Sequence, residues 1–185
     1  MRRIRAVLLD CGDTLVDEAT EVKDGLQVSQ RADLIPGADE LIWELKRRGY
    51  PLALVADGPE GTFINNLTPH DLYNAFDAYA ISGILGVEKP HADIFHYALR
   101  TLGVTAEDYA RVVMMGNNLG RDIKGANAIG IISVWLDWSP RRSKTPADVT
   151  ETPHYSIKNP LELLAVLDRL EHLEPDAQPG RDQNK

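Results

Sequence analysis

Residues 8–17 read LLDCGDTLVD, and this stretch decides how the rest of the chain is interpreted. It begins inside an apolar run, IRAVLLD at 4–10, which is typical of a strand buried on both faces of a sheet. The run stops at Asp10, and the short polar loop Cys11 to Thr14 follows directly. A buried strand that ends in such a loop predicts a functional group at the edge of a sheet, with Asp10 as the first candidate.

Composition and charge limit the classes of protein to consider. The chain has 185 residues, 43% hydrophobic and 26% charged, which is ordinary for a globular domain. Its formal net charge of -8 argues against a general nucleic-acid-binding surface or an anionic membrane surface as partner. No stretch approaches the ~20 apolar residues of a membrane span. With one cysteine, Cys11, no intrachain disulfide can form, and we expect a cytoplasmic protein.

Apolar runs alternate with amphipathic segments along the chain. The apolar runs are typical of buried strands and lie at 4–10, 51–57, 77–82, 111–116 and 131–136. The amphipathic segments are typical of helices and lie at 38–49, 92–103, 120–130 and 159–170, the last with Asn159 as N-cap and Pro160 at the first helical position. This alternation predicts an α/β fold: a three-layer, Rossmann-like parallel sheet with helices on both faces.

We expect a single core domain over residues 1–173. The segment 174–185 is polar and holds two prolines, so we expect it to be disordered. Residues 137–154 are a long Pro-rich connection that carries Arg141, Arg142 and Lys144. This connection fits a surface loop or a functional lid, and the surface loop is the simpler interpretation.

The residues that follow the predicted strands carry the chemistry, because ligands bind at the carboxyl ends of parallel strands. Asp10 follows the first strand, Asp57 the second and Asn117 the fourth. Asp122 lies one turn into the next helix, and Lys89 opens the helix after the third strand. Oxygen ligands and a lysine at one edge predict a magnesium site with a phosphate clamp.

Four segments, in this order, resemble the motifs of the haloacid dehalogenase (HAD) superfamily of aspartate-nucleophile hydrolases. LLDCGDTLVD at 8–17 is similar to the first motif, a strand followed by Asp-x-Asp-x-Thr. LALVADG at 52–58 resembles the second motif, a strand that ends in Ser or Thr. GVEKPHADIF at 86–95 is similar to the third, a Lys-Pro segment, and VVMMGNNLGRDIKGANAIG at 112–130 resembles the fourth, Gly-Asp followed later by Asp.

The resemblance implies a phosphatase mechanism. Asp10 would be the nucleophile and would form an aspartyl-phosphate that water then hydrolyses. Lys89 would neutralise charge on the phosphoryl oxygens and on Asp10. A Mg²⁺ cofactor would bind Asp10, the backbone carbonyl of Gly12, Asn117 and Asp122.

Three positions depart from the family pattern. Gly12 stands where the second aspartate serves as general acid and base, and Asn117 stands where a carboxylate would meet the metal. Ala56 stands where a hydroxyl would bind phosphate, which leaves the backbone N–H groups around Ala56 and Asp57 for that task. Thr14 would brace the loop on the substrate side. A positioned general acid is worth roughly 10²–10⁴ in rate, so we expect weakened activity that favours aryl or acyl phosphates over alkyl ones.

Three further residues near the motifs invite a chemical role. Asp13 is expected to stabilise the turn rather than to replace the missing acid. His91 is expected to be a solvated residue at a helix start. Cys11 is expected to be a packed residue rather than a reactive thiol.

The chain lacks room for the cap domain that family members with small substrates carry. The intervals 17–35 and 58–86 are both short, and residues 18–34 offer at most a small flap. The resemblance therefore implies a capless domain with an open site. Capless relatives act on large substrates or take a lid from a neighbouring subunit. The resemblance is therefore compatible with a macromolecular phosphorylated substrate and with a homo-oligomer.

Two other functions compete with the phosphatase interpretation. The first is a catalytically silent relative that binds a phosphorylated ligand or a protein partner, because three losses fall in one site. The second is carbon–halogen hydrolysis, which needs no general acid but does need a cap and a hydroxyl in the second motif. A receiver domain does not fit, because its acceptor aspartate lies on a mid-chain strand and its acidic pair near the start.

Overall fold

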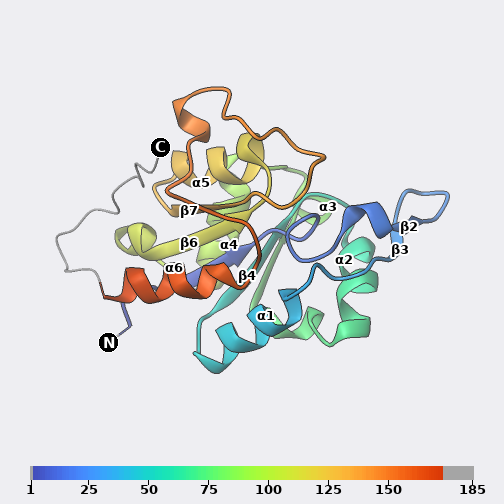
Figure 1. Ribbon diagram of the computed structural model, residues 1–185, viewed down its shortest axis with the longest axis horizontal. Coiled ribbons are helices and arrows are strands. Elements are labelled where there is room, and N and C mark those ends of the chain that lie inside the picture. Colours follow the sequence, from blue (N-terminus) through green and yellow to red (C-terminus); the bar gives the residue numbers. More distant parts are fainter. Residues whose placement is uncertain (1, 173–185) are drawn as a thin grey trace.

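The central strand of the fold is β1 (Ala6–Leu9), which leads into the loop that the sequence singled out. It lies in a six-stranded sheet of order β5-β4-β1-β6-β7-β8, in which every neighbouring pair is parallel (Figure 1). This computed structural model describes residues 2–172 of the chain. The other strands of the sheet are β4 (Leu52–Ala56), β5 (Ala78–Ile81), β6 (Val112–Gly116), β7 (Ile132–Leu136) and β8 (Tyr155–Ile157).

Helices cover both faces of the sheet, which confirms the predicted three-layer α/β fold. The helices are α1 (Ala38–Arg47), α2 (Glu60–Leu67), α3 (Ser82–Leu85), α4 (Ala92–Thr101), α5 (Lys124–Ala128) and α6 (Glu162–Glu171). Side chains alternate along β1, so Val7 and Leu9 join the core under α1, α2 and α6. Ala6 and Leu8 join the opposite core, under α4 and α5.

The register of the central strands brings their carboxyl ends to one edge. Leu9 at the end of β1 pairs with Leu54 of β4 on one side and with Met115 of β6 on the other. The backbone N–H of Asp10 donates to the carbonyl of Met115 at 3.0 Å, so the ladder continues to the first residue of the loop. The residues that follow β1, β4 and β6 therefore share a single edge.

The start of the last helix differs from the prediction. α6 begins at Glu162 with Leu161 as its N-cap, so the assignment of Asn159 as N-cap and Pro160 as first helical residue is wrong by two positions. The chain before α6 winds more tightly, because Leu163 and Leu164 donate to carbonyls three residues back instead of four. Asn159 Oδ1 nevertheless accepts the N–H of Glu162 at 3.3 Å.

The predicted helix at 120–130 has two parts. Leu119–Ile123 forms a π-helical turn, and α5 continues from it and ends at Ala128. Gly130 follows with φ +79°, as expected for a residue that terminates a helix. The wider turn at 119–123 carries Asp122, which is consistent with the frequent occurrence of π-helical turns at functional sites.

Residues 18–34 hold structure that the sequence did not predict beyond a flap. A 3-10 turn (Glu18–Thr20) leads into an antiparallel hairpin of β2 (Val22–Lys23) and β3 (Ser29–Arg31). Figure 1 shows this hairpin beside α2. Ser29 Oγ donates to Asn66 Oδ1 at 2.9 Å, and Asn65 Nδ2 donates to the carbonyl of Ser29 at 2.9 Å. The hairpin is therefore fastened to α2.

The fold does not test two of the expectations from the sequence, which concern the disordered segment and the single domain. The predicted disordered segment 174–185 lies outside the described residues, and the single domain over 1–173 stays a prediction. Among the described residues, every helix is too short or too polar to cross a membrane.

Phe95 offers a test of the packing between α4 and α5. Its side chain is fully buried, and a Cβ added at Gly125 would lie 2.3 Å from its ring, so the two helices meet closely there. We expect Phe95→Ala to lower the free energy of unfolding by about 3–5 kcal/mol. Urea denaturation measures this change. Tyr97→Ala on the same helix removes a partly exposed aromatic ring and should cost much less; equal losses would contradict the packing described.

Candidate active site

Asp10 is held at the edge of the sheet by two side chains. Its carboxylate is almost fully buried, at 8% exposure for the residue. Thr14 Oγ1 donates to Asp10 Oδ2 at 3.1 Å, and Lys89 Nζ donates to Asp10 Oδ1 at 2.7 Å. Thr14 lies four residues further along the same loop, so its hydroxyl fixes the loop and the carboxylate together.

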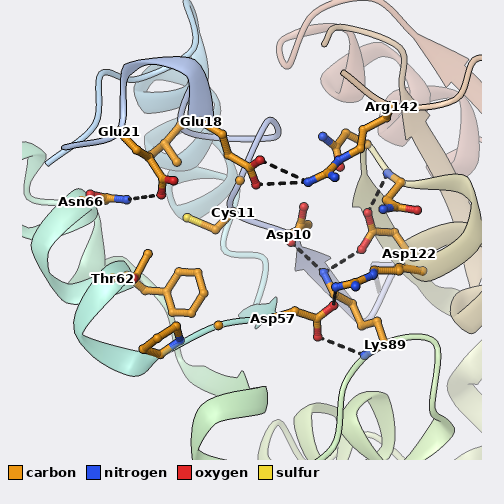
Figure 2. Close-up of a pocket in the computed structure, with 18 of the residues that line it drawn as sticks. Asp10, Cys11, Glu18, Glu21, Asp57, Thr62, Asn66, Lys89, Asp122 and Arg142 are labelled. Carbon is orange, nitrogen blue, oxygen red and sulfur yellow. Dashed lines mark hydrogen bonds and ion pairs between the residues drawn. The ribbon is translucent and has the colours of Figure 1, made fainter. Parts of the chain in front are cut away.

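Lys89 joins three segments of the site through its buried ammonium group. Besides Asp10, it pairs with Asp122 at 2.7 Å and donates to the carbonyl of Val55 in β4 at 2.9 Å. The close-up in Figure 2 shows Lys89 reaching toward the two carboxylates from below. Asp10, Lys89 and Asp122, which the sequence placed after three different strands, thus meet at one point.

Burial and charge shift the proton affinities of this cluster. Burial disfavours the ammonium form of Lys89, but the carboxylates of Asp10, Asp122 and Asp57 outweigh it and raise the pKa of Lys89. Burial, and next the charge of Asp10, raise the pKa of Asp122 to about 7, against the opposing effect of Lys89. Asp122 therefore depends on a nearby cation to remain charged beside Asp10.

Asp122 approaches the sheet edge because Gly116 leaves room for it. A Cβ at Gly116 would lie 2.3 Å from Asp122 Cγ, so a larger residue at the end of β6 would displace this carboxylate. Asp122 Oδ2 accepts the N–H of Asn118 at 2.9 Å, which fixes its orientation.

Asn117 lies beside this carboxylate, directly after β6. Its residue is 4% exposed, and its Nδ2 atom has no hydrogen-bond partner within residues 2–172. Its backbone carbonyl is occupied, because it accepts the indole N–H of Trp135 at 3.0 Å. An unpartnered buried N–H donor is available to an acceptor atom of a ligand.

In the second motif, the Asp57 carboxylate and the N–H of Gly58 already make hydrogen bonds within the protein. Ala56 is the buried last residue of β4. Asp57 accepts the backbone N–H of Lys89 and the guanidinium of Arg121, both at 3.0 Å. The N–H of Gly58 donates to Ser82 Oγ at 2.9 Å. The carboxylate of Asp57 therefore positions the Lys89 segment.

The first loop turns sharply after Asp10. Asp13 adopts a left-handed conformation with φ 52° and is fully buried. Its carboxylate accepts the N–H of Glu18 at 3.2 Å and pairs with Arg141 from residues 137–154. This geometry agrees with the expectation that Asp13 stabilises the turn. The 137–154 segment is thus anchored to the first motif.

The other two residues that invited a chemical role also behave as expected. Cys11 is buried, and burial, followed by the charge of Asp10, raises the pKa of its thiol well above the usual value. His91 is exposed and accepts the N–H of Asp93 at the start of α4, at 3.3 Å.

A pocket of about 310 Å³ opens above this cluster. Its floor is formed by the motif residues, and one wall by the β2–β3 hairpin and the start of α2. Glu18, Arg121 and Arg142 are among the lining residues that were not predicted as site residues. Arg142 Nη2 lies 3.1 Å from Glu18 Oε2. Burial, and next the charge of Asp13, raise the pKa of Glu18, whereas Arg142 lowers it.

The donors around the pocket floor are suited to a hard cation. Asp10 and Asp122 offer carboxylate oxygens, Gly12 a backbone carbonyl and Asn117 an amide. Mg²⁺ prefers oxygen ligands of these kinds and keeps several waters. No group of three or more His, Cys, Asp or Glu side chains in residues 2–172 is arranged to hold a metal, so the two carboxylates need the neutral oxygens as well.

Comparison with known proteins identifies the family. The haloacid dehalogenase-like hydrolase family matches residues 21–130 of the chain. The chain therefore belongs to this family, as the four motifs implied. The fold agrees: the protein YfnB from Bacillus subtilis superposes with a TM-score of 0.73 at 19% identity, over 90% of this chain and 100% of that one.

Two curated relatives are phosphatases. Phosphoserine phosphatase from Thermus thermophilus is 34% identical over 128 residues, which are 69% of this chain and 49% of the relative. Glyceraldehyde 3-phosphate phosphatase from Pyrococcus furiosus is 31% identical over 135 residues, 73% of this chain and 55% of the relative. The chain thus spans about half the length of these relatives.

The charge balance of the cluster is testable by removing its cation. We expect Lys89→Met to lower the free energy of unfolding by about 3–5 kcal/mol, because two buried carboxylates lose their partner. Adding Asp122→Asn should recover part of the loss, because one of the two charges disappears. Urea unfolding in metal-free buffer measures both changes.

A surface lysine provides the matched control. Lys46 pairs with Asp77 at 2.8 Å, but both side chains are substantially exposed. We expect Lys46→Met to cost less than about 1 kcal/mol. A similar cost for the two lysine variants would contradict the central role of Lys89.

Proposed function

We propose that the chain is a magnesium-dependent phosphatase that acts through Asp10. One observation carries the proposal: the carboxylate of Asp10 lies on the floor of a pocket, 2.7 Å from the buried ammonium of Lys89 and 3.1 Å from the hydroxyl of Thr14. The phosphatase names of the two relatives support the same reaction class.

The chain's own residues account for the main requirements of phosphoryl transfer, which are positioning and charge neutralisation. Thr14 and Lys89 hold Asp10 in one orientation, so that one of its oxygens can attack phosphorus. Attack releases the alcohol and leaves an aspartyl-phosphate, which water hydrolyses to phosphate and free Asp10. Lys89 offsets the negative charge that the phosphoryl group brings into the pocket.

Mg²⁺ would be held by Asp10, Asp122, the carbonyl of Gly12 and the amide of Asn117, and when bound it would supply further positive charge beside the phosphoryl group. Asn117 in place of a carboxylate lowers the negative charge of this donor set by one. We therefore infer weaker metal affinity than an acidic residue at that position would give.

The phosphate-binding side of the pocket is sparse. Ala56 brings no hydroxyl, Asp57 is paired with Arg121, and the N–H of Gly58 donates to Ser82. In this proposal, phosphate is bound by Lys89, by the Mg²⁺ ion and by backbone groups at the end of β4. This is consistent with the weakened activity expected from the sequence.

The size of the pocket bears on the substrate. A volume of about 310 Å³ lies at the lower end of the range for small-molecule sites. It favours a small phosphomonoester over the macromolecular substrate considered from the sequence. The single buried cysteine suits a reducing compartment, and a cytoplasmic location remains part of the proposal.

A phosphate-release assay with a panel of phosphomonoesters and Mg²⁺ tests the function. We expect release that stops when a chelator removes the metal. Asp10→Asn should lower kcat by a factor on the order of 10⁴ or more, because it removes the nucleophile. Asp93→Asn, at an exposed position of α4, should leave the rate unchanged.

The alternatives give different results in the same assay. Binding of phosphate or Mg²⁺ without turnover would contradict the proposal and favour a silent binding protein. Chloride release from a 2-chloroacid, without phosphate release from any ester, would favour carbon–halogen hydrolysis.

A further inference from the structure

The space beside Gly12 is filled by a carboxylate from another residue. A Cβ built on Gly12 would lie 2.1 Å from Oε1 of Glu18 and 2.9 Å from its carboxyl carbon. The Glu18 carboxylate thus occupies the volume into which any side chain at residue 12 would extend. The backbone of Gly12 is outside the left-handed region, so its conformation does not itself require glycine. A side chain at residue 12 would therefore have to displace the end of the Glu18 side chain.

Glu18 is held in this position from both ends. Its backbone N–H donates to Asp13 Oδ1 at 3.2 Å, at the start of the 3-10 turn. Its carboxylate meets Arg142, with Nη2 at 3.1 Å from Oε2 and 3.5 Å from Oε1. Figure 2 shows Glu18 and Arg142 facing each other above Asp10, on the same pocket as Lys89.

We propose that Glu18 is the general acid and base that the first motif lacks. The inference rests on the phosphatase function proposed above and concerns the same site. It is carried by the coincidence of one carboxylate with the space left by one missing side chain. Glu21, the next glutamate along the loop, instead pairs with Lys23 at 2.9 Å.

The proton that Glu18 gives up in the first step of the reaction is regained in the second step. As an oxygen of Asp10 bonds to phosphorus and the ester P–O bond breaks, protonated Glu18 gives its proton to the departing oxygen and becomes a carboxylate. A neutral alcohol leaves. Water then attacks the aspartyl-phosphate, and Glu18 takes the proton that this water loses. Phosphate leaves, Asp10 is a carboxylate again and Glu18 is protonated for the next cycle.

Arg142 acts on Glu18 as a positioning residue. Its shorter contact is to Oε2, whereas Oε1 is the oxygen nearest the Gly12 position. The Arg142 side chain is 40% exposed and that of Glu18 is 31% exposed, so solvent screens their attraction. The pair therefore orients the carboxylate while Oε1 remains directed at the space beside Gly12.

The leaving group distinguishes an acid from a merely structural residue. An aryl phosphate releases a stable phenolate and needs little help, whereas an alkyl phosphate needs a proton on its leaving oxygen. We expect Glu18→Gln to lower kcat/KM for glycerol 2-phosphate by roughly 10²–10⁴. The kcat/KM for p-nitrophenyl phosphate should fall by a much smaller factor. The ratio of kcat/KM for the aryl ester to kcat/KM for the alkyl ester therefore rises. Glu21→Gln, which changes a neighbouring carboxylate of the same pocket, should leave this ratio unchanged.

Moving the carboxylate to residue 12 provides a rescue experiment. The atom that a new Cβ would meet is the end of the flexible Glu18 side chain, so the space can be reassigned. Gly12→Asp combined with Glu18→Gln should restore the turnover of glycerol 2-phosphate, in part or in full. Gly12→Ala combined with Glu18→Gln brings the same Cβ without a carboxylate and should not restore it. Equal urea midpoints for the variants would show that each one folds.

The outcomes separate this inference from the function on which it rests. Absence of Asp10-dependent phosphate release from both esters in the parent protein would overturn the phosphatase function and the role of Glu18 together. Asp10-dependent release with an equal loss on both esters in Glu18→Gln would overturn the role of Glu18 alone. A selective loss on the alkyl ester, reversed by the carboxylate at residue 12, would support it.

Discussion

One buried ammonium group governs the arrangement of this site. Lys89 lies within 2.7 Å of Asp10 and of Asp122, and both carboxylates are shielded from water. Two such charges repel each other in a medium of low dielectric constant, so a cation between them is a condition for placing them together. Because the three residues come from three separate segments, this condition also ties β1 to the segments that follow β5 and β6 in the chain.

The sheet and the position of the site were accessible from sequence for a simple reason. Buried parallel strands are nearly continuous apolar runs, and the residues that end them must share an edge. Asp10, Lys89, Asn117 and Asp122 could therefore be grouped without coordinates. Asp57 shows the limit of this reasoning: it reaches the same edge, but its carboxylate is taken up by Arg121 and by the backbone of Lys89.

The parts that escaped prediction depend on contacts between distant residues. The β2–β3 hairpin is short and polar, and it is fastened through Ser29 to Asn66 on α2. The course of the first loop depends on Asp13 meeting Arg141, 128 positions later. Neither contact leaves a periodic pattern in the sequence. Gly12 illustrates the consequence. The sequence alone shows only that a side chain is missing at this position, whereas the structure shows that the carboxylate of Glu18 fills the space beside Gly12.

The ends of the sheet have a bearing on how the protein behaves at high concentration. Its two edge strands, β5 and β8, are four and three residues long, and the hairpin strands β2 and β3 are two and three residues long. An edge strand is a template for pairing with another chain through its free N–H and C=O groups, and a short edge presents few of them. The apolar strands β4, β1, β6 and β7 all lie between other strands of the sheet. The short edge strands thus protect a strongly apolar sheet from the addition of strands from other molecules.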